Sequence, residues 1–572
     1  MSRLACVVLA MVAAVPALAA DQAESTSMSD RFNQFLKEHE AKVAPMERAA
    51  NLAWWEAMTT GKDEAYQRSS KLRTELENVY TDPQAFAFLK EARSSGAIVN
   101  PIKRRLLEVI YLRYLGRQLD PALLARIIER STAIEQRFST FRAKVDGKEV
   151  TDNQIDDVLA SSRSRGERKA YWLASKQVGA TLAADVVEVV KLRNQAARKL
   201  GFRDFYAMQL VLNEQDETWL LGLFDELDRL TARPFVAAKA RIDAVQASRM
   251  GAAAGELMPW DYTNRFFQEP PNLSDLDFDA PLAGKQIGSI VAAFYRGIGL
   301  NADPILARSD LLEHKGKNPH AFCQDMDHSG DVRALLNIKP NQAWLGTTLH
   351  ELGHGVYSYY VDRALPYFLR TEDHIFATEG VAMMFGRLSE NAAFYRALAL
   401  ADPAATARMA APMAERLRNE ALLFSRWCQV MLRFEKALYA DPDQDLDALW
   451  WGLVARYQGL KRPPEAPAGG WASKIHIVSV PVYYHNYELG DLYASQLHAA
   501  ICREIYPKGN PAAIIYFGNP KVGRFMKDRV FGPGASLPWQ EFVTYSTGEP
   551  LSPKAFAAQF VGPDASAAAP PR

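Results

Sequence analysis

The chain has 572 residues, with 67 basic and 67 acidic side chains, and 48% of its residues are hydrophobic. This composition is typical of a soluble globular protein that is long enough to bury a large core. The balanced charge excludes the strong basic field of nucleic-acid-binding and lipid-surface-binding proteins, so we expect neither partner.

The first twenty residues have the pattern of a secretory signal peptide. Arg3 precedes an apolar run from Leu4 to Val15, and small residues follow it as far as Ala20. The run is too short to span a membrane comfortably, and no later stretch is apolar enough to do so. We therefore expect cleavage of residues 1–20 and a mature protein that is secreted or periplasmic, without stable membrane insertion.

The rest of the chain reads as one domain, residues 21–562, followed by a Pro- and Ala-rich tail, residues 563–572, that we expect to be disordered. Apolar residues recur at helical spacing from Met28 to about Arg265, and again from Ile287 after a loop-like stretch. Phe322–Met326 and Val332–Ile338 resemble two short strands around a turn. The three cysteines beyond the signal are widely separated, and we expect them to be reduced and buried: Cys323, Cys428 and Cys502.

The central motif is H-E-x-x-H, with His350, Glu351 and His354 in a helical run from Ala343 to about Val361. Residues four apart share one helix face, so both imidazoles can bind one metal ion. A neighbouring carboxylate that does not bind the metal can act as general base for a bound water. The alternative is a helix with two hydrogen-bonded structural histidines.

A catalytic zinc ion takes a third protein ligand. Glu379 is the best candidate because it lies in an otherwise apolar helix, where a lone carboxylate is costly to bury unless it is paired or binds metal. Glu372 and Asp373 lie in a polar stretch, where we expect them to be solvated. The alternative for Glu379 is a position at the helix start that faces solvent. Helical spacing then continues to about Tyr457, and it resumes from Tyr487 to Ile505.

The H-E-x-x-H helix, followed 25 positions later by a glutamate in an apolar helix, resembles the angiotensin-converting-enzyme-like peptidyl-dipeptidases. The likeness extends over roughly residues 51–562. Other segments follow the family's order and spacing: Arg193–Arg198 with Gly201, Phe202 and Asp204, Trp450–Trp451 with Tyr457–Gly459, and Pro538–Trp539 with Thr547–Gly548. The resemblance implies a mostly α, large two-lobed metallopeptidase with a deep central cleft and a few short strands near the zinc site.

Three further segments resemble the family's catalytic ones. They are His320–Ala321, thirty residues before His350, Lys474–Ile477, which matches K-x-H-I, and Tyr484–Tyr487, which matches Y-x-x-Y. In the family the first lies on an edge strand of the substrate cleft, and the others stabilise the transition state and bind the substrate's free carboxylate. The resemblance implies these roles: general base for Glu351, oxyanion stabilisation for His476 and Tyr487, substrate binding for His320, Ala321, Lys474 and Tyr484, and zinc binding for His350, His354 and Glu379.

The physical chemistry of these side chains agrees with the implied roles. A donor aimed at a developing oxyanion contributes a few kcal/mol, and a desolvated carboxylate needs a cation. The alternatives are a solvated loop charge for Lys474, simple packing for Tyr484 and Tyr487, and a surface position for His320. We expect three other histidines to be structural: His328, His485 and His498.

The chain also departs from the family pattern. Met383 replaces an aspartate that would orient a zinc-bound imidazole, so that support must come from elsewhere. The glutamine expected at the carboxylate pocket has no obvious counterpart, and Asp261 or Tyr262 falls nearest to its place. Val454 and Asn486 replace two arginines of the chloride sites, so we expect little chloride dependence.

These observations predict a monomeric zinc peptidyl-dipeptidase that acts on oligopeptides with a free C-terminus. One alternative is a zinc oligopeptidase that cuts internally, or a carboxypeptidase that releases one residue. Another is a catalytically weak, zinc-containing peptide-binding protein. The intact Glu351 argues against the last, because a structural metal site needs no general base.

Overall fold

The computed structural model describes residues 27–561, so the predicted signal peptide and the C-terminal tail lie outside the described residues. The described chain is mostly helical, with two small antiparallel two-stranded sheets, which confirms the predicted fold class. The predicted division into two lobes across a cleft stays a prediction. None of the described helices is both long enough and apolar enough to cross a membrane.

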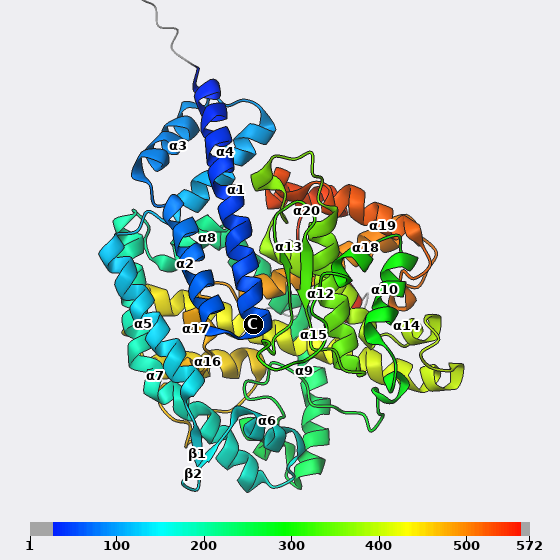
Figure 1. Cartoon of the computed structure of the whole chain (residues 1–572). Helices are drawn as coiled ribbons and strands as arrows, with labels where there is room; N and C mark the ends of the chain where they lie inside the picture. The colour runs from blue at the N-terminus through cyan, green and yellow to red at the C-terminus, as the bar shows by residue number, and fades with distance from the viewer. Residues whose placement is uncertain (1–26, 562–572) are drawn as a thin grey trace, which may run out of the picture.

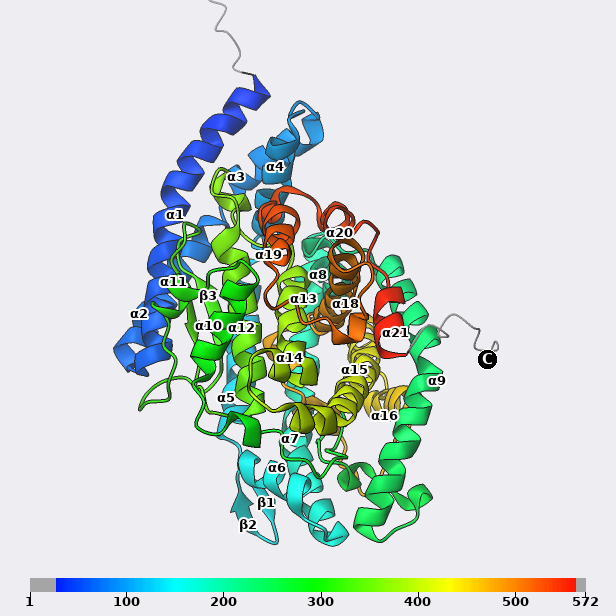
Figure 2. The ribbon, with the colours of Figure 1, turned by 90° about the vertical axis from the view of Figure 1, so that its right-hand side faces the viewer.

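The N-terminal part is a succession of helices, several of which begin with a polar cap followed by proline. Asp82, Asn100 and Asp120 each accept a hydrogen bond from the first turn that follows. The helices are α1 (Met28–Thr60), α2 (Asp63–Val79), α3 (Pro83–Ser95), α4 (Pro101–Leu115), α5 (Pro121–Thr140), α6 (Asp152–Ser161), α7 (Arg165–Lys199), α8 (Phe205–Leu212) and α9 (Glu217–Met250). The pair α1 and α2 forms one edge of the molecule (Figure 2).

A hairpin interrupts this series where the sequence analysis expected only helices. Strands β1 (Ala143–Val145) and β2 (Lys148–Val150) pair antiparallel across Asp146 and Gly147. Both turn residues have positive φ, 50° and 78°, as a tight hairpin turn requires. The Asp-Gly pair was the signal that could have identified this hairpin.

The second half contains the predicted strands and the motif helix. β3 (Phe322–Asp325) and β4 (Val332–Leu335) pair with Cys323 opposite Ala334, so both strands are confirmed, with slightly shorter bounds. The helices are α10 (Ile287–Gly297), α11 (Asp303–Leu306), α12 (Gln342–Tyr360), α13 (Ile375–Gly386), α14 (Ala392–Ala397), α15 (Pro403–Ala440), α16 (Leu446–Gln458), α17 (His476–Ser479), α18 (His485–Ile505), α19 (Pro520–Met526), α20 (Trp539–Thr547) and α21 (Lys554–Phe560).

Helices α12, α13 and α18 lie side by side in the middle of the molecule (Figures 1 and 2). Helix α13 is apolar on nearly every side, as a helix enclosed by others must be, and Phe376, Val381 and Phe385 are fully buried. Glu379 is the only charged side chain in this helix. The fold therefore places that carboxylate among buried apolar side chains, with its own side chain 14% exposed.

Small residues allow these three helices to approach closely. A β-carbon at Gly353 of α12 would lie 2.8 Å from the Cα of Ala382 in α13. One at Gly380 of α13 would lie 2.9 Å from the backbone oxygen of Gly490 in α18. Since real β-carbons do not approach backbone atoms so closely, any larger residue must push the helices apart.

The three cysteines of the described chain are unpaired, as expected. Cys428 and Cys502 are buried, whereas Cys323 on β3 is only half-buried. Burial raises the pKa of the Cys502 thiol to about 11, so this thiol is unreactive at neutral pH.

We expect Gly353→Ala to lower the free energy of unfolding by about 1–3 kcal/mol, because the new methyl group overlaps the backbone of α13. The matched control is Gly222→Ala in α9, where nothing lies within 4 Å of the added carbon. That control should stabilise the protein by up to about 1 kcal/mol. Chemical denaturation of both variants measures the difference, and equal stabilities would contradict the predicted close contact.

Candidate metal centre and peptide-binding pocket

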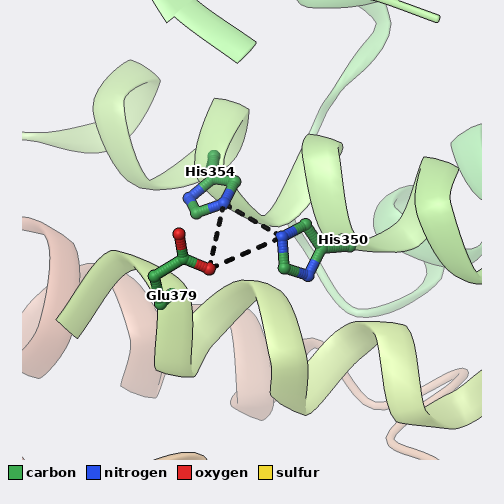
Figure 3. Close-up of side chains that lie close together, drawn as sticks. All are labelled: His350, His354 and Glu379. Atoms are coloured by element: carbon green, nitrogen blue, oxygen red, sulfur yellow. Dashed lines mark hydrogen bonds and ion pairs between the residues drawn. The ribbon is translucent and has the colours of Figure 1, made fainter. Parts of the chain in front are cut away.

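His350 and His354 lie one turn apart on α12, and α13 brings Glu379 opposite them. The two Nε2 atoms are 3.2 Å apart, and the Glu379 Oε2 atom lies 3.7 Å from Nε2 of His350 and 3.9 Å from Nε2 of His354. Figure 3 shows the three side chains pointing toward one another across the two helices. Among the described residues, this is the one cluster of His, Cys, Asp and Glu side chains that could hold a metal ion.

The size of this triangle suits zinc. The point in the plane of these three atoms that is equidistant from them lies about 2.1 Å from each, which is the length of a zinc–nitrogen or zinc–oxygen bond. The exposed fractions of the His350, His354 and Glu379 side chains are 28%, 18% and 14%. The group therefore supplies three ligands and leaves one side open, as a catalytic zinc site requires.

Burial leaves the two imidazoles in the uncharged form that metal binding needs, but it disfavours the charged form of the two carboxyl groups. It lowers the pKa of His350 to about 4 and holds that of His354 well below its usual range, so both imidazoles are neutral and have a free lone pair. Burial raises the pKa of Glu379 to about 7 and that of Glu351 to about 8, with the charge of Glu379 adding to the second shift. A nearby cation lowers the pKa of a carboxyl group, so a bound metal favours both carboxylates.

Thr378 provides the support that Met383 does not. The Nδ1 atom of His354 lies 2.6 Å from the Thr378 hydroxyl oxygen. When Nε2 faces the metal, Nδ1 carries the proton and donates it to this hydroxyl, which fixes the tautomer and the ring. The sequence analysis missed Thr378, although it directly precedes the predicted ligand.

Glu351 and His350 line a cavity of about 540 Å³, which also reaches Gln268 and Phe424. Glu351 is buried at 8% exposure, next to the ligands but outside the triangle. A bound substrate in this cavity therefore contacts both the metal centre and the segment that contains Gln268.

One expectation about the neighbouring acids is wrong. Glu372 is half-buried, but the Asp373 side chain is fully buried, 3.7 Å from Arg105 of α4. Burial raises the pKa of Asp373 well above its usual range. The burial of Asp373 could not be predicted from its polar neighbours in the sequence, because the helix that covers it, α4, lies more than 250 residues earlier in the chain.

Lys474 and Tyr484 meet at a half-buried side chain that the sequence analysis missed. The Nζ atom of Lys474 donates to Oε1 of Gln268 at 3.0 Å, and the Tyr484 hydroxyl lies 3.5 Å from the same oxygen. Lys474 is buried at 8% exposure, over the rings of Trp427 and Tyr484. Burial lowers its pKa to about 8, so the alternative of a solvated loop charge is wrong.

Gln268, rather than Asp261 or Tyr262, is the side chain that contacts Lys474 and Tyr484. Asp261 is fully buried and pairs with Arg165 at 2.8 Å. The hydroxyl of Tyr262 donates to Asp243 at 2.7 Å. Neither residue forms a hydrogen bond or ion pair with Lys474, whose side chain donates to Gln268.

Tyr487 and His476 both pack against the ring of Tyr484. The ring centroids of Tyr487 and Tyr484 are 5.3 Å apart, as are those of His476 and Tyr484. Burial and the nearby negative charge of Glu379 raise the pKa of Tyr487 to about 12, so its hydroxyl stays protonated and can donate. His476 has a buried Nδ1 atom without a hydrogen-bond partner in the described residues.

His320 and Ala321 immediately precede β3 rather than lying within it. The His320 side chain is exposed, and no hydrogen bond or ion pair of the described residues joins it to the zinc ligands. Its backbone N–H donates to Asn318, which holds this approach to the strand.

Other recognised segments hold the pocket in place. Arg193 of α7 donates to the backbone oxygens of Ile477 and Val478, just after His476. His485 bonds Gln215 at 2.7 Å in a buried position, which agrees with a structural role. His328 and His498 likewise have protein partners, Arg370 and Tyr516.

Two family models match the chain. Residues 306–562 match Peptidase family M3, and residues 26–227 match angiotensin-converting enzyme. The first match contains α12, α13 and α18, and the second contains α1 to α8. A comparison with curated proteins found no match.

We expect Thr378→Val to weaken zinc binding about 10- to 100-fold, because the His354 imidazole loses its orienting partner. Thr378→Ser keeps the hydroxyl and should bind zinc nearly as tightly as the parent protein. Competition with a chelator of known affinity measures both variants. An unchanged affinity in the valine variant would show that this hydrogen bond does not orient the ligand.

Proposed function

Because residues 306–562 match Peptidase family M3 and residues 26–227 match angiotensin-converting enzyme, we propose that the chain is an angiotensin-converting-enzyme-like zinc metallopeptidase that removes dipeptides from the free C-termini of oligopeptides. One observation carries the proposal. Lys474 is a buried cation whose side chain donates a hydrogen bond only to the neutral Gln268, and no carboxylate of the described residues lies within 4.0 Å of it.

A buried charge without a counter-ion is costly unless a partner arrives. The carboxylate at the end of a peptide provides that partner, with Lys474 as the cation and Tyr484 as a second donor. The amide of Gln268 can turn its N–H toward the same carboxylate. These three side chains together suit recognition of a free C-terminus.

The catalytic step is assigned to Glu351. A bound zinc ion supplies Lewis acidity, which lowers the pKa of a water ligand to about 7. Glu351 accepts the proton of the attacking water and passes it to the nitrogen of the leaving dipeptide. Because Glu351 is buried, bulk water does not compete with it for either proton.

Stabilisation of the oxyanion is assigned to Tyr487, with His476 in support. The Tyr487 hydroxyl is protonated, and the charge of Glu379 acts on its pKa, which supports a donor near the metal centre. A donor at this position contributes about 3–4 kcal/mol to stabilisation of the transition state. His320 and Ala321, at the start of β3, are proposed to bind the substrate backbone, as an added strand would.

Two further proposals concern the surroundings of the enzyme. Residues 1–20 direct it out of the cytoplasm, to the periplasm or the medium. Activity depends little on chloride, because Val454 is buried and apolar, and Asn486 is neutral and bonds Gln215.

The deciding experiment uses a blocked hexapeptide with a free C-terminus and its C-terminal amide, with mass spectrometry of the products. We expect dipeptide release from the free acid and hardly any from the amide, because the amide cannot pair with Lys474. Internal cleavage of both peptides alike would instead identify an oligopeptidase, and release of single residues a carboxypeptidase. No cleavage with zinc still bound would favour the peptide-binding protein.

We expect Glu351→Gln to retain zinc and to lower kcat by about 10³-fold or more, because the amide cannot accept the proton of the attacking water. Metal analysis and steady-state kinetics measure the two effects separately. The control is Glu372→Gln, a nearby carboxylate outside the zinc group, which should keep most of the activity. Full turnover by the Glu351 variant would refute its role as base.

A further inference from the structure

The turn that presents Gln268 has an unusual backbone. Phe267, the residue before it, has a φ of +53°, in the left-handed region that residues with a side chain rarely adopt. Such a conformation persists only where the surroundings enforce it, and it occurs most often at functional sites. The contacts that hold the Phe267 backbone in this conformation therefore determine where the Gln268 amide lies.

The most direct restraint comes from Gln458, the last residue of α16. Its Nε2 atom donates to the backbone oxygens of Phe266 at 2.9 Å and of Phe267 at 3.0 Å. Gln458 is buried at 1% exposure, so water does not compete for these two carbonyls. One side chain thus fixes two consecutive peptide planes on either side of the strained residue.

Contacts from Asn264 and from helix α7 also hold this turn. The Asn264 side chain accepts from the N–H groups of Phe266 and Gln268. Trp172 and Lys176 of α7 both donate to the backbone oxygen of Arg265. These contacts hold the backbone oxygen of Arg265 and the N–H groups of Phe266 and Gln268, whereas Gln458 bonds the two peptide oxygens that immediately precede Gln268.

We propose that Gln458 is a positioning residue for the C-terminal carboxylate pocket: through the strained turn at Phe267 it holds the Gln268 amide against Lys474 and Tyr484. This inference rests on the proposed function. It assigns Gln458 an effect on recognition of the free carboxylate, and no part in the chemistry at zinc, because its hydrogen bonds end at the turn.

The test compares Gln458→Leu with Gln496→Leu on the acid and amide forms of one blocked peptide. Gln496 is a close match, because it is also 1% exposed and donates to two consecutive backbone oxygens, those of Glu549 and Pro550, at 2.9 and 3.0 Å. For Gln458→Leu we expect KM for the free acid to rise about tenfold, with kcat changed less than about twofold. The kcat/KM for the amide should stay within about twofold of the parent value.

The Gln496 variant should leave the ratio of acid to amide kcat/KM unchanged, whatever its effect on thermal stability. If Gln458→Leu does not fold, Gln458→Asn, which keeps the amide but shortens its reach, carries the same test with a smaller loss. Gln268→Leu allows a double-mutant cycle. In the Gln268→Leu background, Gln458→Leu should not lower the ratio of acid to amide kcat/KM any further.

Three results would overturn the proposal: an unchanged ratio in folded Gln458→Leu, an equal loss on acid and amide, or full additivity with Gln268→Leu. A parent enzyme that does not distinguish acid from amide would instead refute the proposed function itself. The two failures are therefore separable in a single set of assays.

Discussion

The zinc group depends on how closely α12 approaches α13. Two imidazoles on one helix give only two ligands, and the third must come from a neighbour at a distance that suits a metal ion. The missing side chain at Gly353 lets the α13 backbone come near, and the resulting triangle of 3.2, 3.7 and 3.9 Å fits zinc. Gly380 and Gly490 bring α18 equally close, so Tyr484 and Tyr487 are held relative to the same carboxylate.

Burial leaves the metal group in need of a positive charge and the pocket around Lys474 in need of a negative one. Around the metal, Glu351 and Glu379 are carboxyl groups with raised pKa values, which a cation would relieve. At the pocket, Lys474 is a cation with a lowered pKa, which an anion would relieve. A zinc ion and a peptide carboxylate therefore each offset a desolvation cost that the fold already carries. The spacing between the two parts decides how many residues fit between them, and so where the peptide is cut.

The features that were predictable from the sequence are those that a single helix determines. The four-residue spacing of His350 and His354 and the lone Glu379 in an apolar helix predicted the group that the structure brings together. Local periodicity sets the shared helix face, and the apolar surroundings set the desolvation cost. Thr378, Gln268 and the burial of Asp373 were missed because each depends on a segment that approaches from elsewhere in the chain. The β1–β2 hairpin was missed for a different reason, since its Asp-Gly turn was present in the sequence and was overlooked.

The zinc group was easier to predict from the sequence than the pocket around Lys474 because the two lie on different kinds of backbone. The zinc ligands are on helices, which satisfy their own hydrogen bonds and need neighbours only for packing. Gln268 and Lys474 are on irregular segments whose carbonyl groups have no regular partners, so long helices elsewhere must supply donors. Arg193 of α7 serves the segment after His476, and Gln458 of α16 serves the turn before Gln268. Two of the recognised sequence motifs thus hold the backbone on which the proposed recognition of the substrate depends.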